Sequence, residues 1–182
     1  MLSKEKVRKK FFLLRKKKYI EVKKNFFDPL IQLIRKKNKK NISLYYPSNF
    51  EVNTLKLFDL LKNIKHSSTS LPIICKGTNI KFVKWKFPSP LVVNIYGFLE
   101  PAEKKKIVLP DLILIPLLAY DKSFNRLGYG KGYYDRFLNK YRKINRNLLI
   151  IGVAFSFQKY KKIPISKFDV KLDHILTEKG LL

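Results

Sequence analysis

The segment NRLGYGKGYYDRF, residues 125–137, contains the residue types best suited to chemistry in this chain. Gly128, Gly130 and Gly132 are three of the seven glycines in the sequence, and Lys131 stands between the last two. Glycines tolerate positive φ and let backbone N–H groups approach a ligand closely, and a lysine donates readily to phosphate oxygens. We therefore predict that this loop binds a phosphate chain.

Two neighbours of the loop support a phosphate site. Arg126 adds a cationic donor, and a helix that begins near Gly132 would present its N-terminal amides and dipole to an anion. The loop is not a Walker A motif, because no Gly-Lys-Ser/Thr follows at the required spacing. It is not a Rossmann fingerprint either, because Tyr133 occupies the place of the third glycine. A tight turn between a strand and a helix would explain the same glycines.

Asp135 follows the loop and has two interpretations. An acidic residue in the first turn of a helix commonly interacts only with the helix dipole. Beside a phosphate loop, however, a carboxylate can hold Mg²⁺, which takes one or two carboxylates together with water and substrate oxygens. Asp169 and Asp173 in KFDVKLDHIL are candidates for a second carboxylate. We expect His66 and His174 to be surface or packing residues.

The apolar runs predict the elements that position the loop. Residues 110–121, PDLILIPLLAYD, are nearly all apolar, as parallel strands covered on both faces require. The glycine loop, a helix over residues 132–143 and a strand over residues 147–155 complete a βαβ unit. Ligands bind at the carboxyl ends of the strands in such sheets, and the loop leaves that end of the first strand.

Apolar spacing predicts further elements towards the N-terminus. Ser3 is suited to cap a first helix, in which Val7, Phe11 and Leu14 share one apolar face. Pro29 suits the first turn of a second helix. The expected helices span residues 3–20, 26–40 and 52–65, the expected strands span 41–47, 70–75 and 80–85, and 91–101 is either a strand or an irregular entry to the site. This pattern predicts an α/β sheet with helices on both faces.

The composition favours one folded domain over residues 1–182. The chain is 46% hydrophobic, which favours a globular protein over a disordered one. No apolar run reaches the roughly 18 residues of a membrane span, and the N-terminal residues lack the pattern of a signal peptide. Cys75 is the only cysteine, so no internal disulfide can form and a reducing compartment such as the cytoplasm is expected. Its apolar surroundings, LPIIC, favour a buried structural thiol over a nucleophile.

The net charge is strongly positive, with 40 Lys and Arg against 13 Asp and Glu, formally +27. Clustered lysines would indicate a nucleic-acid partner, because they neutralise backbone phosphates. The lysine runs are instead dispersed, and no zinc-ligand spacing, RNA-binding motif or helix-turn-helix accompanies them. We interpret the charge as compositional bias, and expect a monomer that binds small molecules, no specific nucleic acid and no membrane.

Several segments together resemble the 5-formyltetrahydrofolate cyclo-ligase (methenyltetrahydrofolate synthetase) family. They are KEKVR, YYPSNFEVNT, GFLEP, DLILIPLLAYDKSFNRLGYGKGYYDRFL and KFDVKLDHILTEKG, in the order of the family. The resemblance implies a three-layer α/β sandwich with a mainly parallel sheet, like that of the glucosamine-6-phosphate isomerase and CoA-transferase group. It also implies ATP- and Mg²⁺-dependent conversion of 5-formyltetrahydrofolate to 5,10-methenyltetrahydrofolate, with ADP and phosphate as products. The family phosphorylates the formyl oxygen, and N10 then closes the ring.

The resemblance also implies roles for particular residues. Lys4 and Arg8, four apart on the first helix, match phosphate contacts and share a face. Asp135 and Asp169 match magnesium ligands. The ATP loop corresponds to Arg126, Leu127, Gly128, Tyr129, Gly130, Lys131, Gly132, Tyr133 and Tyr134. The folate contacts correspond to Tyr46, Glu51, Tyr129, Gly130, Lys131, Gly132 and Tyr133.

Some of these assignments have alternatives. The Glu51 carboxylate suits the 2-amino and N3–H donors of a pterin, but an acid before a helix can also be an N-terminal helix residue. Trp85 and Tyr96 could supply stacking surface, although ordinary core packing is the favoured interpretation of each residue. Asn53 replaces a frequent acidic residue, and Tyr129 stands where an arginine can occur. A nucleic-acid-binding protein and another sugar-phosphate or CoA enzyme of the same fold are the competing classes.

Overall fold

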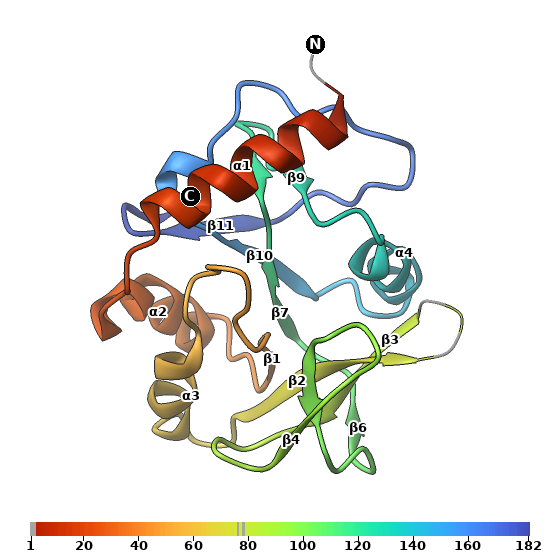
Figure 1. Ribbon diagram of the computed structural model, residues 1–182. Coiled ribbons are helices and arrows are strands. Elements are labelled where there is room, and N and C mark those ends of the chain that lie inside the picture. The colour runs from red at the N-terminus through yellow and green to blue at the C-terminus, as the bar shows by residue number, and fades with distance from the viewer. Residues whose placement is uncertain (1–2, 76, 78) are drawn as a thin grey trace.

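The apolar runs assemble into a large sheet in the computed structural model, which describes residues 3–75, 77 and 79–182 (Figure 1). Its strands are β1 (Asn41–Ser43), β2 (Ser68–Cys75), β3 (Asn79–Lys84), β6 (Ile107–Val108), β7 (Leu112–Pro116), β10 (Leu149–Val153), β11 (His174–Thr177) and β12 (Gly180–Leu181). Two small hairpins pair β4 (Leu91–Val93) with β5 (Leu99–Pro101) and β8 (Ala119–Tyr120) with β9 (Arg126–Leu127). The helices are α1 (Lys4–Lys18), α2 (Asp28–Lys36), α3 (Leu55–Lys62) and α4 (Tyr133–Ile144), with short 3₁₀ turns at Lys24–Phe27 and Ser156–Gln158.

The sheet is parallel in its centre and antiparallel at its edges. Over the described residues its order is β12-β11-β10-β7-β1-β2-β3-β6. Parallel pairs join β11, β10, β7, β1 and β2, and antiparallel pairs add β12, β3 and β6. The expected mainly parallel sheet is confirmed, and β7, α4 and β10 form the expected βαβ unit.

The strand order reverses beside β1. The chain enters the sheet at β1, runs outward through β2, β3 and β6, and returns to β7 on the other side of β1. It then continues outward through β10 and β11. A crevice forms at the carboxyl ends of two strands whose connections lead in opposite directions, and such crevices are where α/β sheets bind ligands.

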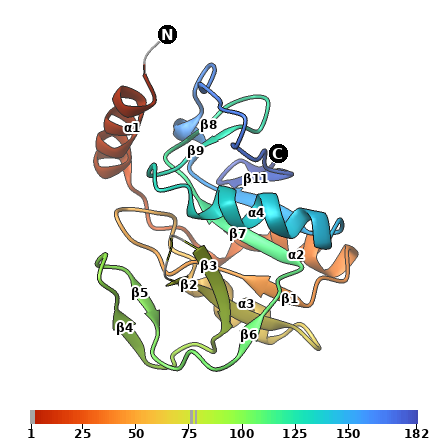
Figure 2. The same ribbon diagram turned by 90° about the vertical axis from the view of Figure 1, so that its right-hand side faces the viewer.

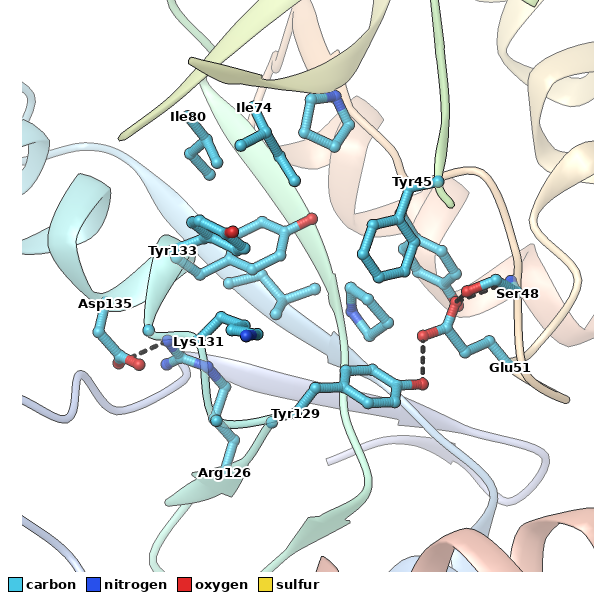
Figure 3. A pocket seen from close by; sticks show the side chains of 18 of the residues that line it. Tyr45, Ser48, Glu51, Ile74, Ile80, Arg126, Tyr129, Lys131, Tyr133 and Asp135 are labelled. Atoms are coloured by element: carbon cyan, nitrogen blue, oxygen red, sulfur yellow. Dashed lines mark hydrogen bonds and ion pairs between the residues drawn. The ribbon is translucent and has the colours of Figure 1, made fainter. Parts of the chain in front are cut away.

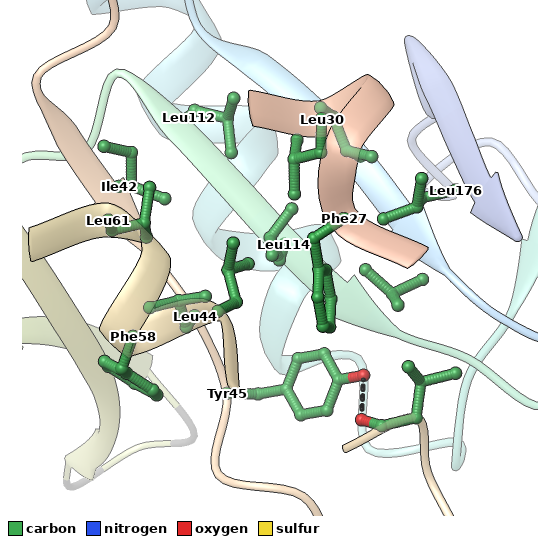
Figure 4. Close-up of a cluster of buried hydrophobic side chains, with 14 of the residues drawn as sticks. Phe27, Leu30, Ile42, Leu44, Tyr45, Phe58, Leu61, Leu112, Leu114 and Leu176 are labelled. Carbon is green, nitrogen blue, oxygen red and sulfur yellow. Dashed lines mark hydrogen bonds between the residues drawn. The ribbon is translucent and has the colours of Figure 1, made fainter. Parts of the chain in front are cut away.

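Helices cover both faces of the sheet, which confirms the expected three layers (Figure 2). Alternating residues of a strand point to opposite faces, and in β7 Leu112 and Leu114 join one core cluster while Ile113 and Ile115 join the other. The first cluster packs against α2 and α3 through Leu30, Phe58 and other apolar side chains (Figure 4). The second packs against α4. The likeness to the glucosamine-6-phosphate isomerase group stays a prediction.

The first helix lies outside these layers, against the β8–β9 hairpin (Figure 2). Ser3 caps α1 as expected, because its side chain accepts a hydrogen bond from the N–H of Lys6. Val7 and Phe11 are buried in a small third core cluster, whose other members are Leu118, Ala119, Leu127 and Ile163. None of the helices in the described ranges 3–75, 77 and 79–182 is long and apolar enough to span a bilayer.

Several predicted elements are shorter or more divided than expected. The strand predicted over residues 110–121 stops at Pro116, because proline has no N–H to donate to a neighbouring strand. The carbonyl of the next residue, Leu117, accepts from the side chains of Arg15 and Gln158. The strand predicted over 41–47 keeps only Asn41–Ser43. The helix predicted over 26–40 is divided into a 3₁₀ turn and α2, and residues 91–101 form the β4–β5 hairpin.

Candidate active site

A cavity of about 400 Å³ opens at the carboxyl ends of β1, β2 and β7. One wall is the segment after β1, which includes Tyr45, Tyr46, Ser48 and Glu51. The opposite wall is residues 126–135, from β9 to the first turn of α4. Its volume lies in the range of small-molecule sites, and its position is the crevice that the strand order creates.

The glycine loop forms a wall of this cavity, but it does not leave β7 directly. The β8–β9 hairpin intervenes, so the prediction that the loop follows the long apolar strand was wrong in this detail. Gly130 has φ of +101° and Gly132 has φ of +66°, and Gly132 is the N-cap of α4. The loop is therefore a turn that needs glycine, and it also brings the N-terminus of α4 to the cavity.

The predicted phosphate contacts of α1 reach the same wall. Lys4 and Arg8 both line the cavity. The Nε of Arg8 donates to the carbonyl of Gly128 at 3.0 Å, and its guanidinium lies close over Gly130. The Nζ of Lys4 lies 2.6 Å from Oδ2 of Asp169. Lys4 and Arg8 therefore lie on one face of α1, as expected, and this face is turned towards the glycine loop.

Arg126 is paired with a carboxylate rather than presented to solvent. Its side chain is 6% exposed, and its Nη2 lies 2.6 Å from Oδ1 of Asp135. It also donates to the carbonyl of Val170. Burial lowers the pKa of Arg126, and the charges of Asp135 and Asp169 oppose this. In this arrangement Arg126 orients Asp135 and ties the C-terminal segment to the glycine loop.

The structure brings together two of the three candidate carboxylates. Asp135 and Asp169 both line the cavity, whereas Asp173 does not. Burial acts to raise the pKa of Asp169, but hydrogen bonds from Lys4 and from the N–H of Ser166 outweigh it, so the pKa is lowered. Asp173 instead pairs with Arg142 and accepts from a backbone N–H of β10. The suggestion that Asp173 could be the second carboxylate was therefore wrong.

Glu51 lies in the facing wall and is 6% exposed. Its Oε2 accepts from the N–H of Ser48 at 2.9 Å, and its Oε1 accepts from the hydroxyl of Tyr129 at 2.6 Å. Burial raises the pKa of Glu51 despite these hydrogen bonds. The helix-acid interpretation does not hold, because α3 begins only at Leu55 and has no acidic residue in its first turn. Glu51 and Asp135 lie on opposite sides of the cavity, with Lys131 between them (Figure 3).

The remaining predicted residues fall into two groups. Tyr46, Tyr129, Lys131, Tyr133 and Tyr134 line the cavity. Leu127 also lies along it, but its side chain is 2% exposed and packs in the third core cluster, so only its backbone is suited to a ligand. Trp85 is 4% exposed and packs against Phe58, which favours the core-packing interpretation.

The β4–β5 hairpin completes the mouth of the cavity. Tyr96 at its tip lies with its ring centroid 6.3 Å from that of Tyr133. Glu100, in GFLEP, is 2% exposed and accepts from the N–H of Ile74 at 2.6 Å and from Asn94 at 2.7 Å. Glu100 therefore fixes the hairpin to β2. Sequence reasoning gave this carboxylate no role.

Sequence reasoning also missed Arg15. Its side chain is 1% exposed, and it donates to the hydroxyl of Tyr129 and to the carbonyl of Asn49. The signal was present in the spacing: Arg15 follows Arg8 by seven residues, which places both on one face of a helix.

Comparisons with known proteins agree on one family. The sequence model of the 5-formyltetrahydrofolate cyclo-ligase family matches residues 3–178. The chain is 32% identical to a 5-formyltetrahydrofolate cyclo-ligase of Mycoplasma genitalium over 183 residues, which covers 97% of this chain and 98% of the relative. It is 32% identical to that of Haemophilus influenzae over 152 residues, 80% of each chain.

Solved structures give the same answer. The structure of a 5,10-methenyltetrahydrofolate synthetase from Aquifex aeolicus matches with a TM-score of 0.75 and 30% identity, over 99% of this chain and 92% of the other. That of a 5,10-methenyltetrahydrofolate synthetase from Mycoplasma pneumoniae matches with a TM-score of 0.74 and 28% identity, over 96% of this chain and 98% of the other.

Proposed function

This chain belongs to the 5-formyltetrahydrofolate cyclo-ligase family, and we propose that it converts 5-formyltetrahydrofolate to 5,10-methenyltetrahydrofolate with consumption of ATP. ADP and phosphate are the other products, and residues 1–182 act as one domain. The observation that carries this proposal is the two-sided cavity. One wall carries glycines, cations and a helix N-terminus, and the other carries the buried carboxylate of Glu51.

The phosphates of ATP bind along the glycine loop. Gly130 and Gly132 have positive φ, and their lack of a side chain lets a ligand approach the backbone N–H groups closely. Arg8 from α1 and Lys131 from the loop itself supply cationic donors. The N-terminus of α4 adds a favourable dipole.

Asp135 and Asp169 fit a magnesium site. Both carboxylates line the cavity, and Mg²⁺ takes one or two carboxylates while water and phosphate oxygens supply its other ligands. Among residues 3–75, 77 and 79–182, no group of three or more His, Cys, Asp and Glu could hold a metal, so the ion would depend on ATP for part of its coordination. Bound there, Mg²⁺ would offset the negative charge of the phosphates.

The pterin of the folate binds against Glu51. Its 2-amino and N3–H groups are two donors side by side, and a carboxylate can accept both. Tyr46 and the ring of Tyr133 lie along the same cavity, where flat aromatic surfaces suit a flat ligand. We infer that a folate bound in this way has its formyl group towards the phosphate wall.

The reaction needs little from the protein except positioning and charge. The γ-phosphoryl group of ATP passes to the formyl oxygen, which is otherwise a poor leaving group, and ADP is released. N10 then attacks the activated carbon, N10 loses its proton, and the oxygen leaves as phosphate. Holding the two substrates in one cavity makes the transfer effectively intramolecular, and Arg8 and Lys131 stabilise the charge on the transferring group.

A direct assay tests this proposal. The protein is mixed with 5-formyltetrahydrofolate and MgATP, and the near-ultraviolet absorbance of the methenyl product is followed. We expect a rise that requires both ATP and the formylfolate. A folded protein that gives no ATP-dependent rise would contradict the proposed function.

A further inference from the structure

Arg15 is a buried cation whose charge the proposed chemistry does not use. It is 1% exposed, and no carboxylate of the described residues forms an ion pair with it. Its hydrogen bonds go to neutral oxygens, and its Nε has no partner among the described residues. A guanidinium in such a place is costly, so its position calls for an explanation.

The acceptors of Arg15 belong to three segments that meet at the cavity. The carbonyl of Asn49, at 2.7 Å, lies in the wall that holds Glu51. The carbonyl of Leu117, at 3.1 Å, follows the end of β7. The third acceptor is the hydroxyl of Tyr129 in the glycine loop, and the guanidinium carbon lies 5.5 Å from the centre of that ring. Arg15 therefore joins the folate wall to the phosphate loop.

The hydroxyl of Tyr129 continues this chain of contacts to Glu51. A tyrosine hydroxyl has one hydrogen, and here it accepts from Arg15, so the hydrogen is directed to Oε1 of Glu51 at 2.6 Å. The other carboxylate oxygen accepts from the N–H of Ser48. These contacts hold the carboxylate plane in one orientation (Figure 3).

We propose that Arg15 and Tyr129 are positioning residues for the folate, which hold Glu51 ionised and oriented for the donors of the pterin. The inference rests on the proposed role of Glu51. Neither residue needs to touch the reacting atoms, because both act through the carboxylate. The arrangement also means that the pterin acceptor and the phosphate loop share one side chain, that of Tyr129.

The charged and titratable groups around Glu51 support this role. Tyr129 faces it from the glycine loop and Arg15 from α1, and Tyr45 and Tyr134 face it from the end of β1 and from α4. Burial raises the pKa of Glu51, and the hydrogen bond from Tyr129 is the largest effect that opposes this. Removing that hydroxyl must raise the pKa further. The acid limb of folate binding, where Glu51 loses its charge, then moves to higher pH.

The test is a double-mutant cycle between Tyr129→Phe and Glu51→Gln, with folate KM, ATP KM and Tm measured on each variant. Glu51→Gln replaces one acceptor by a donor, and we expect folate KM to rise about tenfold to a few hundredfold. We expect Tyr129→Phe to raise folate KM about tenfold, and to move the acid limb of its pH profile upward. In the Glu51→Gln background, Tyr129→Phe should add less than about twofold.

Tyr120→Phe is the matched control. Tyr120 is also buried, its hydroxyl donates to the carbonyl of Ser156, and it lies outside the cavity wall. We expect this variant to change Tm without changing folate KM or its pH profile. Arg15→Lys tests the contact between Arg15 and Tyr129, because the lysine ammonium cannot donate to three acceptors in a fixed plane. We expect its folate KM and pH profile to resemble those of Tyr129→Phe. If Arg15→Lys does not fold, the double-mutant cycle between Tyr129→Phe and Glu51→Gln still tests the inference.

Two outcomes would overturn the inference. If Tyr129→Phe and Glu51→Gln raise folate KM additively, Tyr129 does not act through Glu51. If Tyr129→Phe lowers Tm but leaves folate KM and the pH profile unchanged, its contacts are structural only. A different result, wild-type folate KM in Glu51→Gln, would remove the proposed pterin role itself, so the two failures are distinguishable.

Discussion

Replacing Gly130 by alanine should separate backbone strain from nucleotide binding. The residue has φ of +101°, which side chains rarely adopt, and an added Cβ would lie 3.2 Å from Cζ of Arg8. Strain in such a conformation costs about 2 kcal/mol, which for a chain of this size lowers Tm by about 4–8 °C. Because the Cβ also displaces Arg8 from Gly128, we expect ATP KM to rise about tenfold, the effect of losing one charge-assisted contact.

Gly180→Ala is the matched control for this prediction. Gly180 has φ of +108°, but an added Cβ there meets nothing within 4 Å, and the residue lies in the β11–β12 hairpin away from the cavity. Thermal unfolding should show a similar decrease in Tm for both variants. The initial-rate assay should show a raised ATP KM only for Gly130→Ala. Equal ATP KM values in the two variants would refute the phosphate role of the loop and leave it as a turn.

Three further outcomes are expected. Asp135→Asn keeps a hydrogen-bond acceptor for Arg126 but removes its counter-charge and the proposed metal ligand, so it should fold with a lowered Tm and lose most turnover; near wild-type turnover at limiting Mg²⁺ would contradict the metal role. Nucleic-acid binding, measured by a filter assay, should be weak, independent of sequence and steeply reduced by salt, and tight sequence-specific binding at physiological salt would disprove the compositional explanation of the charge. Burial acts to raise the pKa of Asp121, but hydrogen bonds from Ile163 and Asn125 outweigh it, so the pKa is lowered. The ionised Asp121 therefore stabilises the folded protein above the pKa that it has in the unfolded chain, and this stabilisation is lost as pH falls through the pKa of the folded state. Asp121→Asn should therefore lower Tm at neutral pH, with a difference that shrinks in acid, and a constant difference would be evidence against the ionised role.

The elements that depend on near neighbours were predictable from the sequence. The apolar face of α1 and its cap at Ser3, the helix after Gly132, and the buried strand that begins at Leu112 all appear where patterns indicated them. Periodicity and glycine conformation act over a few residues, so they can be read along the chain. The segments that resemble the family also follow one another in the family's order along the chain, so the family could be predicted from the sequence.

The ends of elements were less predictable. Within the run 110–121, Pro116 is a local signal for the end of the strand, because proline has no N–H to donate to a neighbouring strand, but the partners of the residues after it have no local signal. The carbonyl of Leu117 accepts hydrogen bonds from Arg15 and Gln158, which are distant in sequence. Similarly, Glu51 looked like the N-terminal acid of a helix, but α3 begins only at Leu55 and the Glu51 carboxylate is buried against Tyr129.

The partners of the site residues were decided by tertiary structure alone. Lys4 and Asp169 are 165 positions apart in the chain and lie in contact, and Tyr129 meets Glu51 across a separation of 78. Asp169 and Asp173 were both candidates for the second carboxylate beside Asp135. Only Asp169 lines the cavity, because Asp173 is paired with Arg142. Residue types and spacing specify which groups are available for chemistry, whereas the order of strands around β1 and β7 determines which of them converge, because that order brings chain segments together irrespective of their distance in sequence.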